Sequence, residues 1–268
     1  MDVSARDGGM ERRSLLAGAI GAVGSMAGST ALIPEALAQT GSSIPAGPPV
    51  LQLLASGEAR LPPGEWKQWE KVWGGRNVPL LERNGQWLWG AWRPLSGQID
   101  TTTHKWMYRD VAHYKAMEKM KATDEIQRIT RIDTPQTLEL VASGLMIPLP
   151  YDPGLRPEKR VTGRRIIVVA TIRHEKGAKL DQYTALAGEF MPLARRHGAE
   201  LLGAFETFYS RTIDYREHIW RFAGLDDWHA ALRAIEGDAA ASARLNAMRA
   251  ILPHEVVSFQ EPLNYSKV

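Results

Sequence analysis

The sequence contains no cysteine and carries almost no net charge. Its 268 residues include 33 Lys and Arg against 30 Asp and Glu, for a formal net charge of +3. The absence of cysteine excludes disulfide scaffolds, thiolate metal sites, iron–sulfur clusters and cysteine nucleophiles. Because basic and acidic residues nearly balance, the sequence lacks the excess of positive charge that is typical of nucleic-acid-binding proteins. We therefore expect no nucleic-acid partner.

Several catalytic and cofactor motifs are missing as well. The sequence has no P-loop, no G-x-S-x-G elbow and no H-E-x-x-H pair. Four histidines (His113, His197, His229 and His254) fall in expected helices or turns without metal-ligand spacing. We expect no metal and no cofactor. Haem binding through an axial ligand at His174 or His218 stays open as an alternative.

Beyond the first forty residues there is no long apolar run. Residues 12–16 read RRSLL and resemble the twin-arginine export motif of bacteria. A Gly- and Ala-rich stretch follows, too mildly apolar for a stable membrane span, and residues 36–38 form an A-x-A cleavage pattern. We predict a signal peptide at residues 1–38, read by the twin-arginine translocase, and a poorly ordered leader at residues 39–49. The mature protein would be periplasmic or secreted, with no stable membrane insertion.

The remaining chain contains an internal repeat. Residues 77–91 and 190–204 align at an offset of 113 with seven identities in fifteen positions, among them Pro79/Pro192 and Gly85/Gly198. At an offset of 114, His104 pairs with His218, and further pairs are Trp106/Trp220, Tyr108/Phe222 and Tyr114/Trp228. The mature chain is therefore two diverged copies of one unit.

Each copy predicts the order β-α-β-β-α-β, a ferredoxin-like unit. The expected elements of the first copy are strands at 50–59, 86–94, 104–109 and 137–148, with helices at 65–83 and 111–132. Those of the second are strands at 165–173, 200–209, 217–222 and 255–263, with helices at 178–196 and 225–251. Pro79 and Pro192 predict a kink or break near the last turn of the first helix of each copy. The first unit is placed at residues 50–149, the linker at 150–163 and the second unit at 164–266.

One such unit leaves a sheet face that must be covered. Two units in tandem can cover each other within one chain. We therefore expect an α+β fold in which two ferredoxin-like units form a pseudo-symmetric α/β barrel with four helices outside. Whether two chains pair further into a homo-oligomer stays open.

The second copy resembles the NIPSNAP family, whose members have the dimeric α/β-barrel fold. The resemblance rests on the stretches FMPLARRHGAELLGAF, HIWRFAGLDDWHAAL and LNAMRAILPHEVVSFQEPL. The first copy keeps His104, Trp106 and Tyr108, but Arg109-Asp110-Val111 replaces Leu-Asp-Asp. The resemblance implies the fold, while related barrels include cofactor-independent monooxygenases, haem-binding enzymes and isomerases.

Alternation along two strands selects the candidate site. His104, Trp106 and Tyr108 share one face of a strand, as do His218, Trp220 and Phe222. If these faces look into the barrel, both histidines reach one shared interior, with His104 or His218 as general base and the rings holding a small aromatic or apolar ligand. The alternative is that each histidine is a core residue bonded to backbone.

Two arginines at equivalent strand ends add a second candidate. Arg60 and Arg173 are suited to bind a carboxylate ligand, or each forms a rim ion pair with an acidic neighbour such as Glu82 or Glu189. The function hypotheses are an exported small-molecule enzyme or binding protein, with oxygenase or isomerase chemistry; a non-catalytic barrel; and a haem carrier.

Tryptophan is unevenly distributed. Seven of the nine tryptophans fall in the first copy and two in the second, so the copies have specialised. Trp66, Trp69 and Trp73 share a helix face and are expected in the core. Strict alternation places Trp87 and Trp89 on one strand face and Trp92 on the other.

Overall fold

The computed structural model describes residues 53–96, 100–131, 139–154, 165–174, 177–210 and 215–267. The proposed signal peptide and leader lie outside these ranges, as do residues 155–163 of the predicted linker. The elements of the first unit are β1 (Leu53–Arg60), α1 (Trp66–Val72), a π-helical turn η2 (Trp73–Asn77), α2 (Val78–Arg83), β2 (Trp87–Pro94), β3 (Thr101–Tyr108), α3 (Val111–Lys121), α4 (Asp124–Arg131) and β4 (Glu139–Pro148). Those of the second are β5 (Ile166–Arg173), α5 (Leu180–Arg196), β6 (Glu200–Ser210), β7 (Tyr215–Phe222), α6 (Leu225–Gly237), α7 (Ala239–Ile251) and β8 (Glu255–Pro262).

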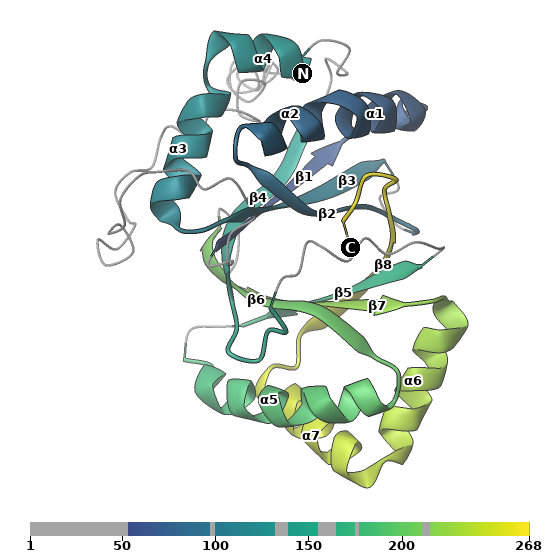
Figure 1. Ribbon diagram of the computed structural model, residues 1–268. Coiled ribbons are helices and arrows are strands. Elements are labelled where there is room, and N and C mark those ends of the chain that lie inside the picture. Colours follow the sequence, from purple (N-terminus) through teal and green to yellow (C-terminus); the bar gives the residue numbers. More distant parts are fainter. Residues whose placement is uncertain are drawn as a thin grey trace, which may run out of the picture.

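The eight strands close into an antiparallel barrel in the order β1-β3-β2-β8-β5-β7-β6-β4. The last strand of each unit joins the two halves, because β4 pairs with β1 and β6 while β8 pairs with β5 and β2. The helices of the first unit lie on one side of the barrel and those of the second on the opposite side (Figure 1). The predicted α/β barrel of two ferredoxin-like units is confirmed. Among the described residues, no helix is long and apolar enough to cross a membrane.

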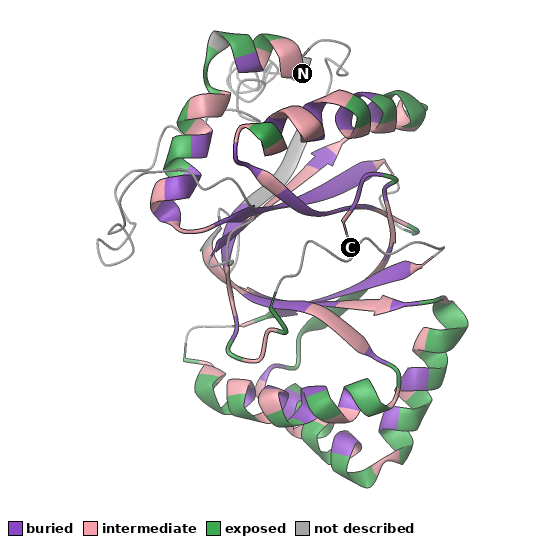
Figure 2. Cartoon of the chain, in the orientation of Figure 1, coloured by how far each residue is buried: buried purple, intermediate pink, exposed green. Residues whose placement is uncertain are grey.

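Three apolar layers stabilise this arrangement. The barrel interior holds Leu54, Met107, Phe205 and Ile219, all with no exposed surface. Two further clusters fill the spaces between each half of the barrel and its helices. The strands are therefore largely buried while the helices keep an exposed outer face (Figure 2). Burial on both faces explains why a strand such as β5, IIVVATIR, is apolar on both sides.

β-Bulges shift the expected alternation in both units. The register of β2 against β3 changes between Leu88 and Gly90, and β6 shows the same change between Leu201 and Gly203. One extra residue brings Trp89 and Trp92 to the same side of the strand. Their rings meet edge to face inside the barrel, with the ring centroids 5.9 Å apart. The prediction that these two tryptophans lie on opposite faces was wrong because it assumed an unbroken period of two.

A π-helical turn shifts the repeat offset within the first helix, ahead of the aligned residues 77–91. The first helical segments begin at Trp66 and Leu180, an offset of 114, whereas α2 and α5 end at Arg83 and Arg196, an offset of 113. The turn η2 thus contains the one extra residue of the first unit. It lies just before Pro79, near the predicted break. By contrast, α5 continues through Pro192 as one helix, so there is no break at this proline.

The tail that follows the last strand of each unit crosses onto the other unit. After β4, the backbone N–H of Leu149 donates to the carbonyl of Ala204 in β6 over 2.8 Å. After β8, Leu263 donates in the same way to Ala91 in β2 over 2.9 Å. Both acceptors adjoin the bulges. Residues 148–152 and 262–266 (PLPYD and PLNYS) are equivalent at an offset of 114, so the repeat extends through these crossing tails.

The tail of the second unit explains one glycine in η2. A Cβ built on Gly74 would lie 2.8 Å from Cδ1 of Tyr265, whereas one built on the equivalent Gly188 in α5 would meet nothing within 4 Å. We expect Gly74→Ala to lower the free energy of unfolding by about 1–3 kcal/mol through overpacking. The matched Gly188→Ala should raise it by up to about 1 kcal/mol through helix propensity. Urea denaturation measures both, and equal effects of the two substitutions would contradict the close packing of Tyr265.

Candidate functional site

Each unit places its strand histidine against a tyrosine from the crossing tail of the other unit. Nε2 of His104 lies 2.8 Å from the hydroxyl of Tyr265, and Nε2 of His218 lies 2.8 Å from that of Tyr151. The alternative of a histidine bonded to backbone is therefore wrong for this nitrogen in both units. Both pairs depend on the crossing tails, so each unit needs the other to complete its site.

The histidine faces look toward the helices and not into the barrel. Trp106 and Tyr108 belong to the layer beneath the helices of the first unit, and Phe222 to the corresponding layer of the second. Their neighbours along the strands, such as Met107 and Ile219, fill the barrel interior. The prediction of one shared interior with two histidines was wrong, because alternation groups residues by face without saying which face looks inward.

Both histidines are neutral at physiological pH. Burial lowers the pKa of His104 to about 3, because desolvation disfavours the charged imidazolium. Burial and the nearby Arg216 lower the pKa of His218 to about 3. Burial raises the pKa of Tyr151 and Tyr265 above their usual range. Each pair is thus a neutral imidazole hydrogen-bonded to a neutral phenol.

Tryptophan side chains close the site of the first unit. The rings of Trp69 and Trp73 stack on each other and lie 5.9 and 5.1 Å from the His104 ring. Nε1 of Trp69 donates to the Tyr265 hydroxyl over 3.1 Å, and Trp106 stacks on His104 from within the strand. The expected core role of the helix tryptophans is therefore combined with covering His104.

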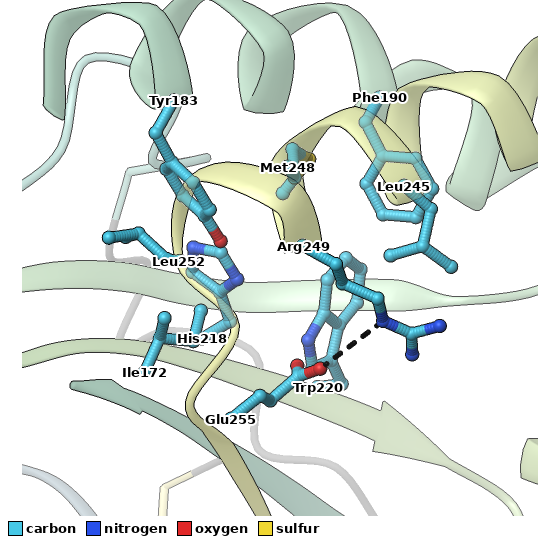
Figure 3. A pocket seen from close by; sticks show the side chains of 10 residues that line it. All are labelled: Ile172, Tyr183, Phe190, His218, Trp220, Leu245, Met248, Arg249, Leu252 and Glu255. Atoms are coloured by element: carbon cyan, nitrogen blue, oxygen red, sulfur yellow. Dashed lines mark ion pairs between the residues drawn. The ribbon is translucent and has the colours of Figure 1, made fainter. Parts of the chain in front are cut away.

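The second unit has a cavity at the corresponding place. With the extra residue of η2 taken into account, Trp69 corresponds to Tyr183 and Trp73 to Ala187. Tyr183 lies 6.2 Å from the His218 ring, but the second indole has no counterpart. A cavity of about 50 Å³ lies beside His218, lined by residues that include Tyr183, Phe190 and Trp220 (Figure 3).

A loose ion pair borders this cavity on one side. Nε of Arg249 in α7 lies 3.7 Å from a carboxylate oxygen of Glu255, at the start of β8, and both residues line the cavity (Figure 3). Another arginine, Arg216, is buried and bound on several sides: it donates to both Glu206 and Thr184 and stacks on the Tyr183 ring. The cavity is therefore lined by an apolar wall, the neutral imidazole of His218, and the loosely paired Arg249 and Glu255.

The other predicted binding residues are structural or peripheral. The Tyr108 hydroxyl accepts a hydrogen bond from Gln86, and Phe222 packs in the core. Trp220 is the one predicted ring that lines the cavity. Arg60 pairs with Asp100 at 3.5 Å, while Arg173 is exposed at the end of β5. Neither arginine lines the cavity. The expected partners form other ion pairs, Glu82 with Lys267 and Glu189 with Arg244.

An ion pair that the sequence pattern did not single out lies inside the barrel. Nζ of Lys105 has no exposed surface and donates to a carboxylate oxygen of Glu217 over 2.5 Å and to Ser56 over 3.0 Å. Glu58 is nearby, and its burial raises the pKa of its carboxyl despite the attraction of Lys105. The pair joins β3 of the first unit to β7 of the second through the centre of the barrel.

The described residues fit neither a metal nor a haem. No group of three or more His, Asp or Glu is placed to hold a metal in the part of the chain that the structure describes. Nε2 of His218 is bonded to Tyr151, and the adjoining space measures about 50 Å³. Pockets that hold drug-sized molecules begin at roughly 300 Å³ and a haem is larger than most of these, so this space is far too small for a haem. His174 does not line this cavity.

The closed eight-stranded barrel of two ferredoxin-like units places this chain among the dimeric α/β-barrel proteins. The NIPSNAP family model matches residues 60–153, about a third of the chain. The match falls on the first unit, although the sequence resemblance was clearest in the second. A search of curated proteins found no match.

Solved structures share the fold over most of the chain. A candidate monooxygenase from Fusobacterium nucleatum superposes with a TM-score of 0.54 at 8% identity, covering 80% of this chain and 94% of that one. An anthrone oxidase-like protein gives 0.50 at 12% identity, covering 80% and 92%. A candidate chlorite dismutase gives 0.51 at 12% identity, covering 80% and 96%. Identities this low establish the fold alone.

Proposed function

We propose that this protein binds a small, largely apolar molecule in the cavity of the second unit and transfers a proton from it to His218. The observation that carries the proposal is the contrast between the two units. The same His–Tyr pair is covered by two indoles in the first unit and adjoins a cavity in the second. If both histidines served only to fill the core, we would expect both to be covered in the same way.

The environment of His218 defines the substrate chemistry. A neutral imidazole with a pKa of about 3 is a weak base until a negative charge forms beside it and stabilises the imidazolium. The fitting substrate loses a proton to give an anion within the cavity, as an enol or a phenol does. Tyr183 and Trp220 would hold its apolar part and exclude water. As the reaction class, we propose oxygenase or isomerase chemistry without a cofactor. The oxidising enzymes named among the structural neighbours support this choice.

Ligand identification tests this proposal. We expect protein purified from its native source to release a small molecule that mass spectrometry detects. Leu245→Trp, which adds bulk at a half-buried residue lining the cavity, should abolish recovery of that molecule. Leu186→Trp is the control, since Leu186 is equally half-buried in α5 but does not line the cavity. Equal recovery from both variants would exclude this cavity and favour a non-catalytic barrel.

We also propose that the protein is exported by the twin-arginine route, on the basis of residues 12–16 and 36–38. Replacing both Arg12 and Arg13 by lysine is expected to reduce the periplasmic protein at least tenfold and to leave the precursor in the cytoplasm. Arg6→Lys is the matched control and should be exported normally. Cell fractionation with immunoblotting measures both, and normal export of the twin-lysine variant would refute the proposed route.

A further inference from the structure

We propose that the ligand of the second-unit cavity is a small organic acid whose anionic group binds Arg249 in place of Glu255. The inference rests on the proposed function and specifies its substrate class. Its basis is the position and bonding of one arginine. Arg249 and Glu255 line the same cavity as His218, with Arg249 on α7 and Glu255 at the start of β8 (Figure 3).

The bond between these two residues is weak. Nε of Arg249 and the Glu255 carboxylate are 3.7 Å apart. This separation is too long for a hydrogen bond. Elsewhere in the same unit, Arg216 and Arg221 each bind a glutamate through both Nε and Nη2. Within the described residues, Glu255 is the ion-pair partner of Arg249, and about half of the Arg249 side chain is exposed. The guanidinium thus has donors available for a second acceptor.

A carboxylate that displaces Glu255 from Arg249 would fit this place. The planar guanidinium matches a carboxylate with two parallel hydrogen bonds. Arg216, the other cation close to His218, is bound to Glu206 and Thr184, so Arg249 is the cation left to meet a ligand at this cavity. The apolar wall of Phe190, Leu245 and Met248 would receive a short hydrocarbon group. An anion held there also favours protonation of His218, as the proposed proton transfer requires.

The cavity volume of about 50 Å³ requires short probe molecules. We choose butyrate, 1-butanol and butylamine, which share a four-carbon chain and differ in charge. Binding is followed by NMR titration of the Trp220 indole N–H, which reports on the cavity wall. We expect butyrate to bind at least tenfold more tightly than 1-butanol and to weaken with added salt.

Three variants test the role of Arg249. Arg249→Gln should weaken butyrate binding about tenfold and leave 1-butanol binding unchanged. Glu255→Gln removes the competing carboxylate and should strengthen butyrate binding several-fold. Arg244→Gln removes the same charge from the same helix at an exposed position paired with Glu189, and should leave butyrate affinity within twofold of the parent.

The outcomes separate this inference from the proposed function. Equal binding of butyrate and 1-butanol, with no effect of Arg249→Gln, would overturn the organic-acid inference and leave the cavity as a binding site. Tighter binding of butylamine, lost in Glu255→Gln, would assign the site to a cation and overturn the inference as well. If none of the three probes shifts the Trp220 resonance, both the inference and the proposed function fail.

Discussion

Replacing Lys105 by methionine is expected to lower the free energy of unfolding by about 3–5 kcal/mol. The substitution leaves the Glu217 carboxylate inside the barrel without its cation, close to Glu58. Water cannot compensate, because Glu217 is buried and Lys105 is fully enclosed. Urea denaturation followed by tryptophan fluorescence measures the loss.

The double variant Lys105→Met, Glu217→Leu separates the lost ion pair from the changed packing. Removing both charges should recover most of the stability, since an apolar pair of similar volume is often as stable as a buried ion pair. The exposed pair of Arg244 and Glu189 supplies the control. Here Arg244→Met should cost less than about 1 kcal/mol. If Lys105→Met lowers the free energy of unfolding as little as this exposed control, then Lys105 does not stabilise the buried Glu217 carboxylate.

Stability is expected to fall steeply as the pH drops below about 6.5. His104 and His218 have pKa values lowered from 6.5 to about 3, so between these limits the unfolded state binds more protons than the folded state. Their contribution is fully present above pH 6.5 and is lost as the pH falls toward 3. By linkage the full loss approaches roughly 5 kcal/mol per histidine.

The measurement is the melting temperature between pH 7.5 and 4, with and without His104→Asn and His218→Asn. The double asparagine variant should show a much shallower slope over this range, whatever its stability at pH 7.5. Asp152 works in the opposite direction, because burial raises its pKa to about 6 and the folded state holds its proton up to that pH. Asp152→Asn should therefore steepen the slope below pH 6. An unchanged slope in the double asparagine variant would mean that neither histidine is buried in its neutral form.

The repeat was sufficient to predict the fold but not the site. Matching prolines, glycines and aromatic residues at offsets of 113 and 114 define two equal units, and each unit alone leaves a sheet face uncovered. The period of two correctly groups His104 with Trp106. It cannot say which face of β3 looks inward, because the strand is buried on both faces. The shared interior therefore failed as a prediction.

Other features depended on information that local patterns lack. Lys105 shares the inward face of β3 with Met107. No residue of β3 itself indicates that its partner is Glu217, which comes from β7 of the other unit. The tyrosines were within reach of sequence reasoning. Extending the offset of 114 to residues 148–152 and 262–266 aligns Tyr151 with Tyr265, which would have marked both tails as parts of the repeat.

The crossing tails have a consequence for how the two halves can change. Tyr151 follows the last strand of the first half but binds His218 of the second, and Tyr265 follows the last strand of the second half but binds His104 of the first. A substitution in the tail of one half therefore changes the site of the other half, so the two halves cannot accumulate substitutions independently. The helix residues that cover each histidine belong to the same half as that histidine, so they can change independently in the two halves. At this position Trp73 fills the site of the first half, whereas Ala187 leaves the site of the second half open, although both halves descend from one repeated unit.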